Sequence, residues 1–396
     1  MPLRWRVVAL LFVVRTTMAF QFQSVAALGP LVRADFGVGL ADLGLLIGLY
    51  LSPGIVLALP SGTLGRRFGD KPCVLAGLGL MVVGGLVMAL GVGWPAQLGG
   101  RLLSGFGGVL LNVLMSKIIT DWFAGREIAT AMAIYVNSWP FGIAIALMAL
   151  PFAGAALGVQ GAYLVSVVAA AAGAVLLLTF YRPPAGAVPA GEAKMGPQGG
   201  TPTGHAAAAI VVAGLIWGLF NGAISMVFSF GNSMLAERGW TLAAAGGATS
   251  LALWMTVLSV AAGGVLADRS GRPGAVLVGG CLAFALMLGI TARTDAVLPA
   301  FAVLGLVCGL PVGAIMSLPA RVLSERTRAV GMGIFWTMFY LCIVVAPWLA
   351  GWLAGTTGSV SAAFDFGGVL LLLACACYAV FMRLALPRAH AAATGD

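Results

Sequence analysis

Gly264-Val-Leu-Ala-Asp268-Arg269-Ser-Gly271-Arg272-Pro273 is a short charged connection between two long apolar runs. A diverged copy, Gly62-Thr-Leu-Gly-Arg66-Arg67-Phe-Gly69-Asp70-Lys71, lies about half a chain earlier, and it too joins two apolar runs. The same connection in the same kind of place indicates that the chain is a duplication of one half.

The composition places the chain in a lipid bilayer. Hydrophobic residues make up 61% of it, charged residues only 8%, and the mean hydropathy is +1.06, whereas soluble domains carry about 25% charged residues. A net charge of +9 would suit a nucleic-acid partner. However, the basic residues collect in short connections between apolar runs, so we expect a membrane protein with no nucleic acid as partner.

Twelve apolar runs are long enough to cross about 30 Å of hydrocarbon. They predict an all-α membrane protein of twelve transmembrane helices in two six-helix bundles, covering residues 1–181 and 206–396. Residues 182–205 are rich in Pro, Gly and Ala and predict a cytoplasmic linker. The runs fall at 5–31, 43–64, 73–93, 96–118, 128–151, 161–181, 206–232, 242–266, 274–292, 296–319, 330–354 and 362–385.

The short charged connections also predict the orientation. A helix that leaves the bilayer and re-enters at once needs a tight turn, which Gly69 and Gly271 allow because glycine has no Cβ. Most Lys and Arg fall on the side of these turns and of both termini, with Arg33, Arg238 and Arg293 on the other. By the positive-inside rule both termini are cytoplasmic. The high Ala and Gly content with short loops suggests a bacterial inner membrane.

The pattern Gly-x-Leu-Ala-Asp-Arg-x-Gly-Arg resembles the loop signature of the major facilitator superfamily, which stands between helices 2 and 3 and often again between helices 8 and 9. The resemblance implies two bundles with a substrate site between them, working by alternating access. It also implies that the acid latches one half against the other, a role we assign to Asp268 with Arg269. The first copy has Arg66 where the family has an acid and Asp70 where it has a base, so its role stays open. The candidate gating residues are Gly62, Arg66, Arg67, Gly69, Asp70, Gly264, Asp268, Arg269, Gly271 and Arg272.

Acidic residues are absent from the middle of every predicted helix. Each Asp and Glu falls at a loop, a helix end or a tail, and the two histidines, His205 and His390, fall in the linker and the tail. A buried carboxylate or imidazole proton relay therefore has no carrier. No metal cluster, nucleophile triad or phosphate loop has the right spacing, so we expect no enzyme, metal or cofactor.

Arg15 is the first candidate for substrate binding. It lies about 15 Å along a helix from Trp5, close to the middle of a core about 30 Å thick. An arginine there costs on the order of 3 kcal/mol, which a role in gripping an oxyanion would explain. The alternatives are a structural arginine bonded to backbone carbonyls and one that snorkels to the interface. Gln23 flanks the same helical stripe.

Arg101 is the second candidate. The segment Arg101-Leu-Leu-Ser-Gly105-Phe-Gly107 resembles the Arg-x-x-x-Gly-x-Gly motif of helix 4 in the same superfamily, where the arginine is linked to proton or substrate coupling. Asn112 shares its face. Snorkelling to the nearby outer interface is the alternative for Arg101, and the small residues are equally suited to close helix packing.

Further polar and aromatic residues suit a cavity wall. Asn137 precedes Trp139-Pro140, a helix-bending pair, and Asn221 lies on a polar stripe of the seventh predicted helix. Tyr340, like Trp254 and Trp336, is placed to stack on a ligand. Hydrogen bonding between helices and simple packing are the alternatives for all of these residues.

These residues predict a secondary transporter for a small organic or inorganic anion, with Arg15, Gln23, Arg101, Asn112, Asn137, Asn221 and Tyr340 as substrate-binding residues. A coupling proton or an exchanged anion is a further expected partner, and the functional unit is expected to be a monomer. One alternative is multidrug or metabolite efflux, in which Arg15 is structural. A more distant alternative is a membrane sensor that transports nothing.

Overall fold

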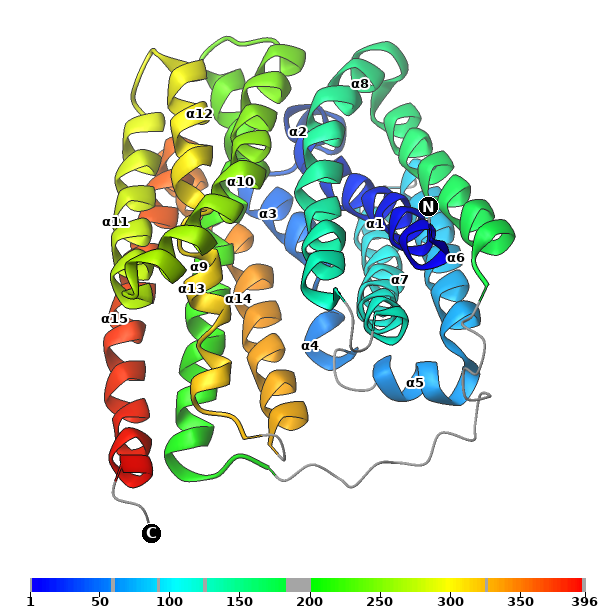
Figure 1. Ribbon diagram of the computed structural model, residues 1–396. Helices are drawn as coiled ribbons and strands as arrows, with labels where there is room; N and C mark the ends of the chain where they lie inside the picture. The colour runs from blue at the N-terminus through cyan, green and yellow to red at the C-terminus, as the bar shows by residue number, and fades with distance from the viewer. Residues whose placement is uncertain are drawn as a thin grey trace.

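The computed structural model describes residues 2–57, 61–90, 93–123, 127–182, 201–324 and 327–393. Throughout these ranges the regular structure is helical, and Figure 1 shows the helices gathered into two sets, α1–α8 and α9–α15. The helices are α1 Leu3–Ala27, α2 Gly29–Phe36, α3 Leu40–Leu49, α4 Gly54–Leu57, α5 Ser61–Phe68, α6 Asp70–Ala89, α7 Gly93–Trp122, α8 Ile128–Phe180, α9 Gly204–Glu237, α10 Leu242–Ser270, α11 Pro273–Thr291, α12 Val297–Cys308, α13 Val312–Met316, the 3₁₀ turn η1 Pro319–Arg321, α14 Arg328–Thr357 and α15 Ser361–Ala393.

The twelve predicted spans are confirmed in number. Eleven helical segments among the described residues are long and apolar enough to cross a membrane, and one of them runs over Ile134–Phe180. Gly158 interrupts that segment with a φ of 71°, a conformation that residues with a Cβ rarely adopt. Because α8 turns back at this glycine (Figure 1), it supplies two spans where the sequence predicts 128–151 and 161–181.

Two predicted spans are not continuous helices. The run at 43–64 consists of α3, α4 and α5, and the run at 296–319 consists of α12, α13 and η1. The first break in each run lies next to a proline, Pro53 in one and Pro311 in the other. Proline lacks the amide hydrogen that a continuous helix needs. The described residues 181–182 and 201–203 are not helical. Residues 183–200 of the predicted linker lie outside the described part, so the linker boundaries stay a prediction.

The two glycine turns have the predicted geometry. Gly69 between α5 and α6 has a φ of 87°, and Gly271 between α10 and α11 has a φ of 60°. Pro273 follows as the first residue of α11, where its missing amide hydrogen costs nothing. Both copies of the loop therefore turn at a glycine with a positive φ.

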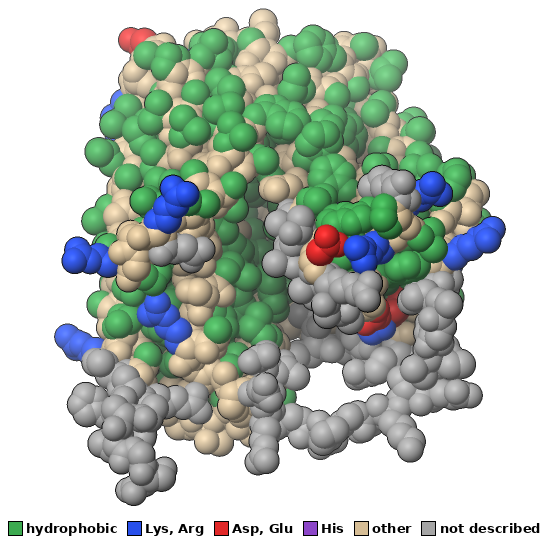
Figure 2. Space-filling view, in the orientation of Figure 1, with side chains coloured by type: hydrophobic (Ala, Val, Ile, Leu, Met, Phe, Trp, Pro, Cys, Tyr) green, Lys and Arg blue, Asp and Glu red, His purple; other side chains and the backbone are tan. Residues whose placement is uncertain are grey.

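The two helix sets are in close contact at one end of the molecule, opposite the end that carries the turns at Gly69 and Gly271. A Cβ on Gly44 or Gly48 of α3 would collide with the α14 backbone at Pro347 or Val344, and one on Gly351 would collide with Leu40. Glycine at these positions therefore lets α3 and α14 approach backbone to backbone. We call this the outer end. Figure 2 shows a recess between the two sets in the lower part of the face shown.

A second pair of helices meets at the outer end through a proline and a glycine. Pro151 of α8 has no amide hydrogen, so the carbonyl of Leu147, one turn earlier, has no intrahelical donor. The space for a Cβ on Gly246 of α10 is occupied by this same carbonyl oxygen. The close approach allows a Cα–H···O contact, which compensates the free carbonyl in part.

Candidate functional site

Arg15 lies in α1 between the two helix sets and is only 9% exposed. Its Nε donates to Asn112 Oδ1 of α7 at 3.0 Å. Its Nη1 donates to the carbonyls of Tyr135 and Val136 of α8, both at 3.1 Å, and lies 3.4 Å from Ser138 Oγ. The guanidinium carbon is 4.5 Å from the centre of the Tyr135 ring. Arg15 therefore joins α1 to α7 and α8.

A proline explains why α8 has a carbonyl to offer. Pro140 lies inside the helix and cannot donate to the Val136 carbonyl one turn earlier. A backbone carbonyl without a hydrogen-bond donor in the hydrocarbon core costs on the order of several kcal/mol. Arg15 supplies the missing donor. Asn137-Ser-Trp139-Pro140 is thus a local arrangement that needs a hydrogen-bond donor beside it, and Arg15 is that donor here.

Arg15 keeps one nitrogen free. Within the part of the chain that the structure describes, Nη2 has no hydrogen-bond partner, and it is not among the fully buried unpartnered atoms. None of the ion pairs between described residues includes Arg15. The site therefore combines a buried positive charge with an accessible donor, which is the arrangement an oxyanion requires.

Tyr340 of α14 brings the second helix set to this site. Its side chain interacts with Asn112 and lies within electrostatic range of Arg15. Its ring packs against Gly54 of α4, where a Cβ would collide with the ring atoms. Asn112 therefore lies between an arginine of one set and a tyrosine of the other, so any movement between the sets changes its surroundings.

Arg101 of α7 differs from Arg15 because all its nitrogens are used. Nε donates to the Leu46 carbonyl at 3.1 Å, Nη1 to Gln21 at 3.2 Å and Nη2 to Phe22 at 2.6 Å. The side chain is 1% exposed, so it does not snorkel to the interface. Leu46 has a carbonyl to offer because α3 ends at Leu49, which leaves its last turn without donors.

Gln23 and Asn232 connect the two helix sets at the outer end. Gln23 Nε2 of α1 donates to the Phe228 carbonyl of α9 at 2.6 Å, and Asn232 Nδ2 of α9 donates back to the Ala27 carbonyl at 3.1 Å. Both side chains are 0% exposed. Gln23, predicted to bind substrate, is thus bonded to the opposite helix set in this structure, and its role in binding stays a prediction.

The other predicted polar residues are more accessible. Asn137 is half-buried and makes no side-chain hydrogen bond to any described residue, while Asn221 donates to the Trp217 carbonyl in its own helix at 2.8 Å. Trp254 contacts Phe141 of the other set, with ring centres 5.3 Å apart. These positions leave a role in binding open to test.

An aromatic group on α9 and α14 continues from Tyr340. The ring of Phe339 lies 5.1 Å from Tyr340, 5.3 Å from Trp336 and 6.2 Å from Trp217. Trp217, Trp336 and Phe339 are all half-buried, so each keeps part of its ring accessible. Together these four residues form an aromatic wall beside Arg15, and only Trp336 and Tyr340 of them were singled out in the sequence.

The predicted gating loops show different contacts. Asp70 pairs with Lys117 at 2.6 Å and Lys71 donates to the carbonyls of Leu178 and Tyr181, so the first loop is attached to its own helix set. In the second loop Arg269 and Arg272 are exposed, as is Arg67 in the first. The surroundings of Gly62 and the side chains of Arg66 and Asp268 are outside the described part of the structure. The latch assigned to Asp268 therefore stays a prediction.

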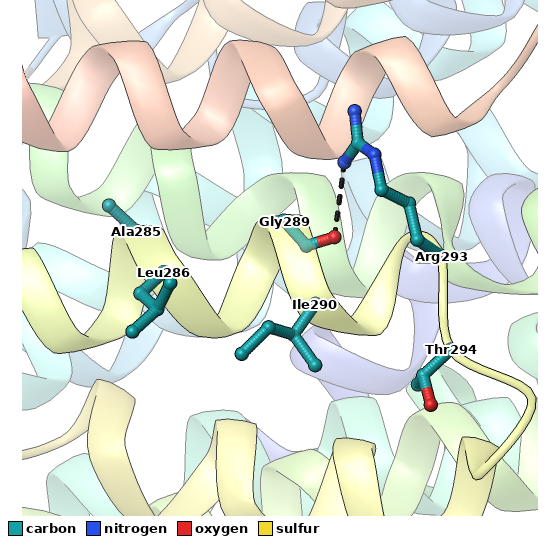
Figure 3. Close-up of a pocket in the computed structure, with 6 residues that line it drawn as sticks. All are labelled: Ala285, Leu286, Gly289, Ile290, Arg293 and Thr294. Atoms are coloured by element: carbon teal, nitrogen blue, oxygen red, sulfur yellow. Dashed lines mark hydrogen bonds between the residues drawn. The ribbon is translucent and has the colours of Figure 1, made fainter.

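A groove of about 620 Å³ lies elsewhere, along α11 near the outer end (Figure 3). Arg293 borders it and donates to both carboxylate oxygens of Asp365 at 2.8 and 2.9 Å. These hydrogen bonds raise the pKa of Arg293 above its usual value. The groove contains no residue of the Arg15 site. The groove is lined by Ala285, Leu286, Gly289, Ile290, Arg293 and Thr294.

Comparisons with known proteins agree with this architecture. The sequence profile of the Major Facilitator Superfamily matches residues 11–231 and 206–395. The uncharacterized MFS-type transporter Rv1250 of Mycobacterium tuberculosis is 31% identical over 34% of this chain and 22% of its own length. The inner membrane transport protein YajR of Escherichia coli is 28% identical over 36% of this chain and 31% of its own. These alignments span less than a third of either relative.

A solved structure extends the likeness over the full length. A bacterial homologue of the human lysosomal transporter Spinster, in an inward-facing and unoccupied conformation, superposes with a TM-score of 0.77 at 15% identity, over 98% of each chain. At that identity the likeness concerns the fold alone. The relatives are described as transporters and not as enzymes. The profile match over nearly all of the sequence, together with the duplicated helix sets and loops, shows that this chain belongs to the Major Facilitator Superfamily.

Proposed function

We propose that the protein is a secondary transporter that moves a small organic or inorganic anion by alternating access, with Arg15 as the group that binds the anion. The observation that carries the proposal is a buried arginine at the contact between the helix sets whose Nη2 has no hydrogen-bond partner, and whose guanidinium has no carboxylate partner, among the described residues. An arginine at mid-membrane costs on the order of 3 kcal/mol. Binding an anion compensates part of that cost, which favours anion over cation.

The other predicted residues divide by what they contact. Asn112 orients Arg15 through its 3.0 Å bond, and Tyr340 contributes from the opposite set. Asn137 and Asn221 are accessible enough to contact the substrate. Arg101 acts as a positioning residue because its three nitrogens are occupied by carbonyls. Gln23 acts at the outer contact.

Transport of the anion is coupled either to the exchange of a second, like-charged anion or to a proton that is carried with it. The described Asp and Glu residues lie at helix ends and loops, so a carboxylate relay through the membrane has no members among them. The contacts at the outer end and the recess in Figure 2 support a state that is open on the side of the glycine turns. Alternating access requires a second state in which the outer contacts separate.

We infer that the glycine turns and both termini face the cytoplasm of a bacterial inner membrane. Arg67, Lys71, Arg269 and Arg272 all lie at this end, and in Figure 2 most Lys and Arg side chains on the visible face lie across its middle and lower part. The positive-inside rule places such an end in the cytoplasm. Reporter fusions at each terminus test this orientation, and activity of a periplasmic reporter would reverse it.

The transport proposal is tested by flux and binding together. Purified protein in liposomes should exchange at least one anion from a panel of nitrate, phosphate, acetate and benzoate, and the same anion should raise its melting temperature. Arg15→Gln should lower the affinity at least tenfold, whereas Arg293→Gln, which alters an exposed arginine far from the site, should not. Anion exchange that is unchanged in Arg15→Gln would contradict the proposal. Accumulation of cationic dyes would favour the efflux alternative instead.

A further inference from the structure

The number of free donors in the site limits the charge of its ligand. Arg15 offers one guanidinium nitrogen, since Nε and Nη1 are occupied, and Arg101 offers none. Each ionised oxygen group that leaves water needs hydrogen-bonding partners, because an unpaired charge in a low dielectric is very costly. One free cationic donor satisfies a single carboxylate. A dianion would bring a second charged group for which these arginines have no partner.

The surroundings of that donor are aromatic. On the α8 side the Arg15 guanidinium lies 4.5 Å from the Tyr135 ring and 5.7 Å from the Trp139 ring. On the opposite side the aromatic wall of Trp217, Trp336, Phe339 and Tyr340 begins at Tyr340, which lies near Arg15. Rings on both sides therefore give the site an apolar surface beside its polar groups, and an inorganic ion would gain little from that surface.

The wall extends in the direction of the recess. Trp336 precedes Tyr340 by one helical turn and lies nearer the start of α14, which is the end away from the outer contacts. Trp336 therefore lies on the side of Tyr340 that is nearer the open end, and part of its side chain is accessible. A ligand that holds its carboxylate at Nη2 has an aromatic surface on which the rest of the molecule can lie.

Resting on the transport function proposed above, we infer that the substrate is a monocarboxylate with an aromatic or other flat apolar body, and that Trp336 and Phe339 select that body. Their offset and edge-to-face contacts contribute beyond simple burial. A small inorganic anion would gain nothing from the wall. A neutral arene would leave the Arg15 charge without its partner.

The test compares four probes on the purified full-length protein: benzoate, acetate, phthalate and benzyl alcohol. Benzoate should raise the melting temperature at a concentration about two- to twelvefold lower than acetate does, which is the range that corresponds to an aromatic contact of about 0.5–1.5 kcal/mol. Phthalate, with its second carboxylate, and benzyl alcohol, with no charge, should each be weaker than benzoate. Exchange of labelled benzoate in liposomes should follow the same order.

Two variants locate the preference. Trp336→Ala should remove the advantage of benzoate over acetate and leave acetate binding unchanged, whereas Trp352→Ala, a tryptophan 53% exposed on the same helix, should change neither. Phe339→Leu is the second variant in case Trp336→Ala fails to fold, and it should reduce the advantage in part.

The outcomes separate the two claims. Equal binding of benzoate and acetate, with no effect of Trp336→Ala or Phe339→Leu and with loss of binding in Arg15→Gln, would overturn the aromatic preference and keep the anion transporter. Tighter binding of phthalate than of benzoate would overturn the single-charge argument. Benzoate binding that survives in Arg15→Gln would instead overturn the proposed function itself.

Discussion

Arg15 Nε lies 3.0 Å from Asn112 Oδ1, so the side chain that holds the buried guanidinium from α7 is a neutral amide and not a carboxylate. The choice of residue matters because a carboxylate would neutralise the cation. Asparagine accepts the hydrogen bond and leaves the charge available to a ligand.

Asn112→Asp tests this relationship. The new carboxylate would pair with Arg15 and compete with any anion for the same positive charge. We expect anion affinity to fall at least tenfold, with a melting temperature equal to or above that of the parent protein. Gln160→Glu is the control, because it adds the same charge at an exposed residue that is not among the hydrogen-bond partners of Arg15. Undiminished anion affinity in Asn112→Asp would show that the ligand does not bind at Arg15.

Arg101→Gln should destabilise the protein more than it changes specificity. Three carbonyls would lose a charged donor, and each such hydrogen bond is worth about 1.5–3 kcal/mol. We expect a loss of at least about 3 kcal/mol in unfolding free energy, measured by denaturant titration. Arg101→Lys should not restore it, because an ammonium lacks the planar fork that reaches three carbonyls.

Arg67, which is exposed, provides the control for Arg101→Gln. Arg67→Gln should leave stability within about 0.5 kcal/mol of the parent value. If Arg101→Gln kept full stability and lost anion binding, Arg101 would contact the substrate directly, as its helix 4 motif suggests.

Gly351→Val should open the outer end. Its side chain would meet the Leu40 backbone and force α3 away from α14, whereas Gly355→Val, one turn further along the same helix, enters open space. Spin labels on the exposed residues Asp35 and Asp295, after replacement of the native cysteines, report the separation. The label distance should increase in Gly351→Val and stay unchanged in Gly355→Val. Identical distances in both variants would show that this contact does not hold the outer end closed.

Gln23→Leu should favour the same opening by a different route. It removes the 2.6 Å hydrogen bond to Phe228 of the other helix set. Gln97→Leu is the matched control, since Gln97 is equally buried and donates to the Met88 carbonyl within its own set. We expect a longer distance between the same two labels only in Gln23→Leu. Loss of stability alone in both variants would make Gln23 an ordinary packing residue.

The fold could be predicted from the sequence because the bilayer restricts the choice of structure. Long apolar runs must be helical there, and the turns at Gly69 and Gly271 follow from their short charged loops. The interruptions after α3 and α12 were not predicted, although Pro53 and Pro311 mark them. In a run that is apolar on all sides, hydrophobicity gives no sign of a break.

The site could be predicted only in part. Arg15 was identifiable because a charge in the middle of a span is costly, but its main acceptors are backbone carbonyls, which no residue type reveals. Pro140 was the available signal, since it frees the Val136 carbonyl. Gln23 was predicted on a cavity face and instead bonds to Phe228, because a polar stripe does not show what lies opposite it.

The three hydrogen bonds of Arg101 have a mechanical consequence. They fasten the backbone of α1 at Gln21 and Phe22 to the backbone of α3 at Leu46. We propose that the two helices then move as one rigid body, although each makes its own contact with the second helix set. A tilt that draws Gly44 away from α14 would also carry Gln23 away from α9, so the two seams at the outer end would part in a single motion.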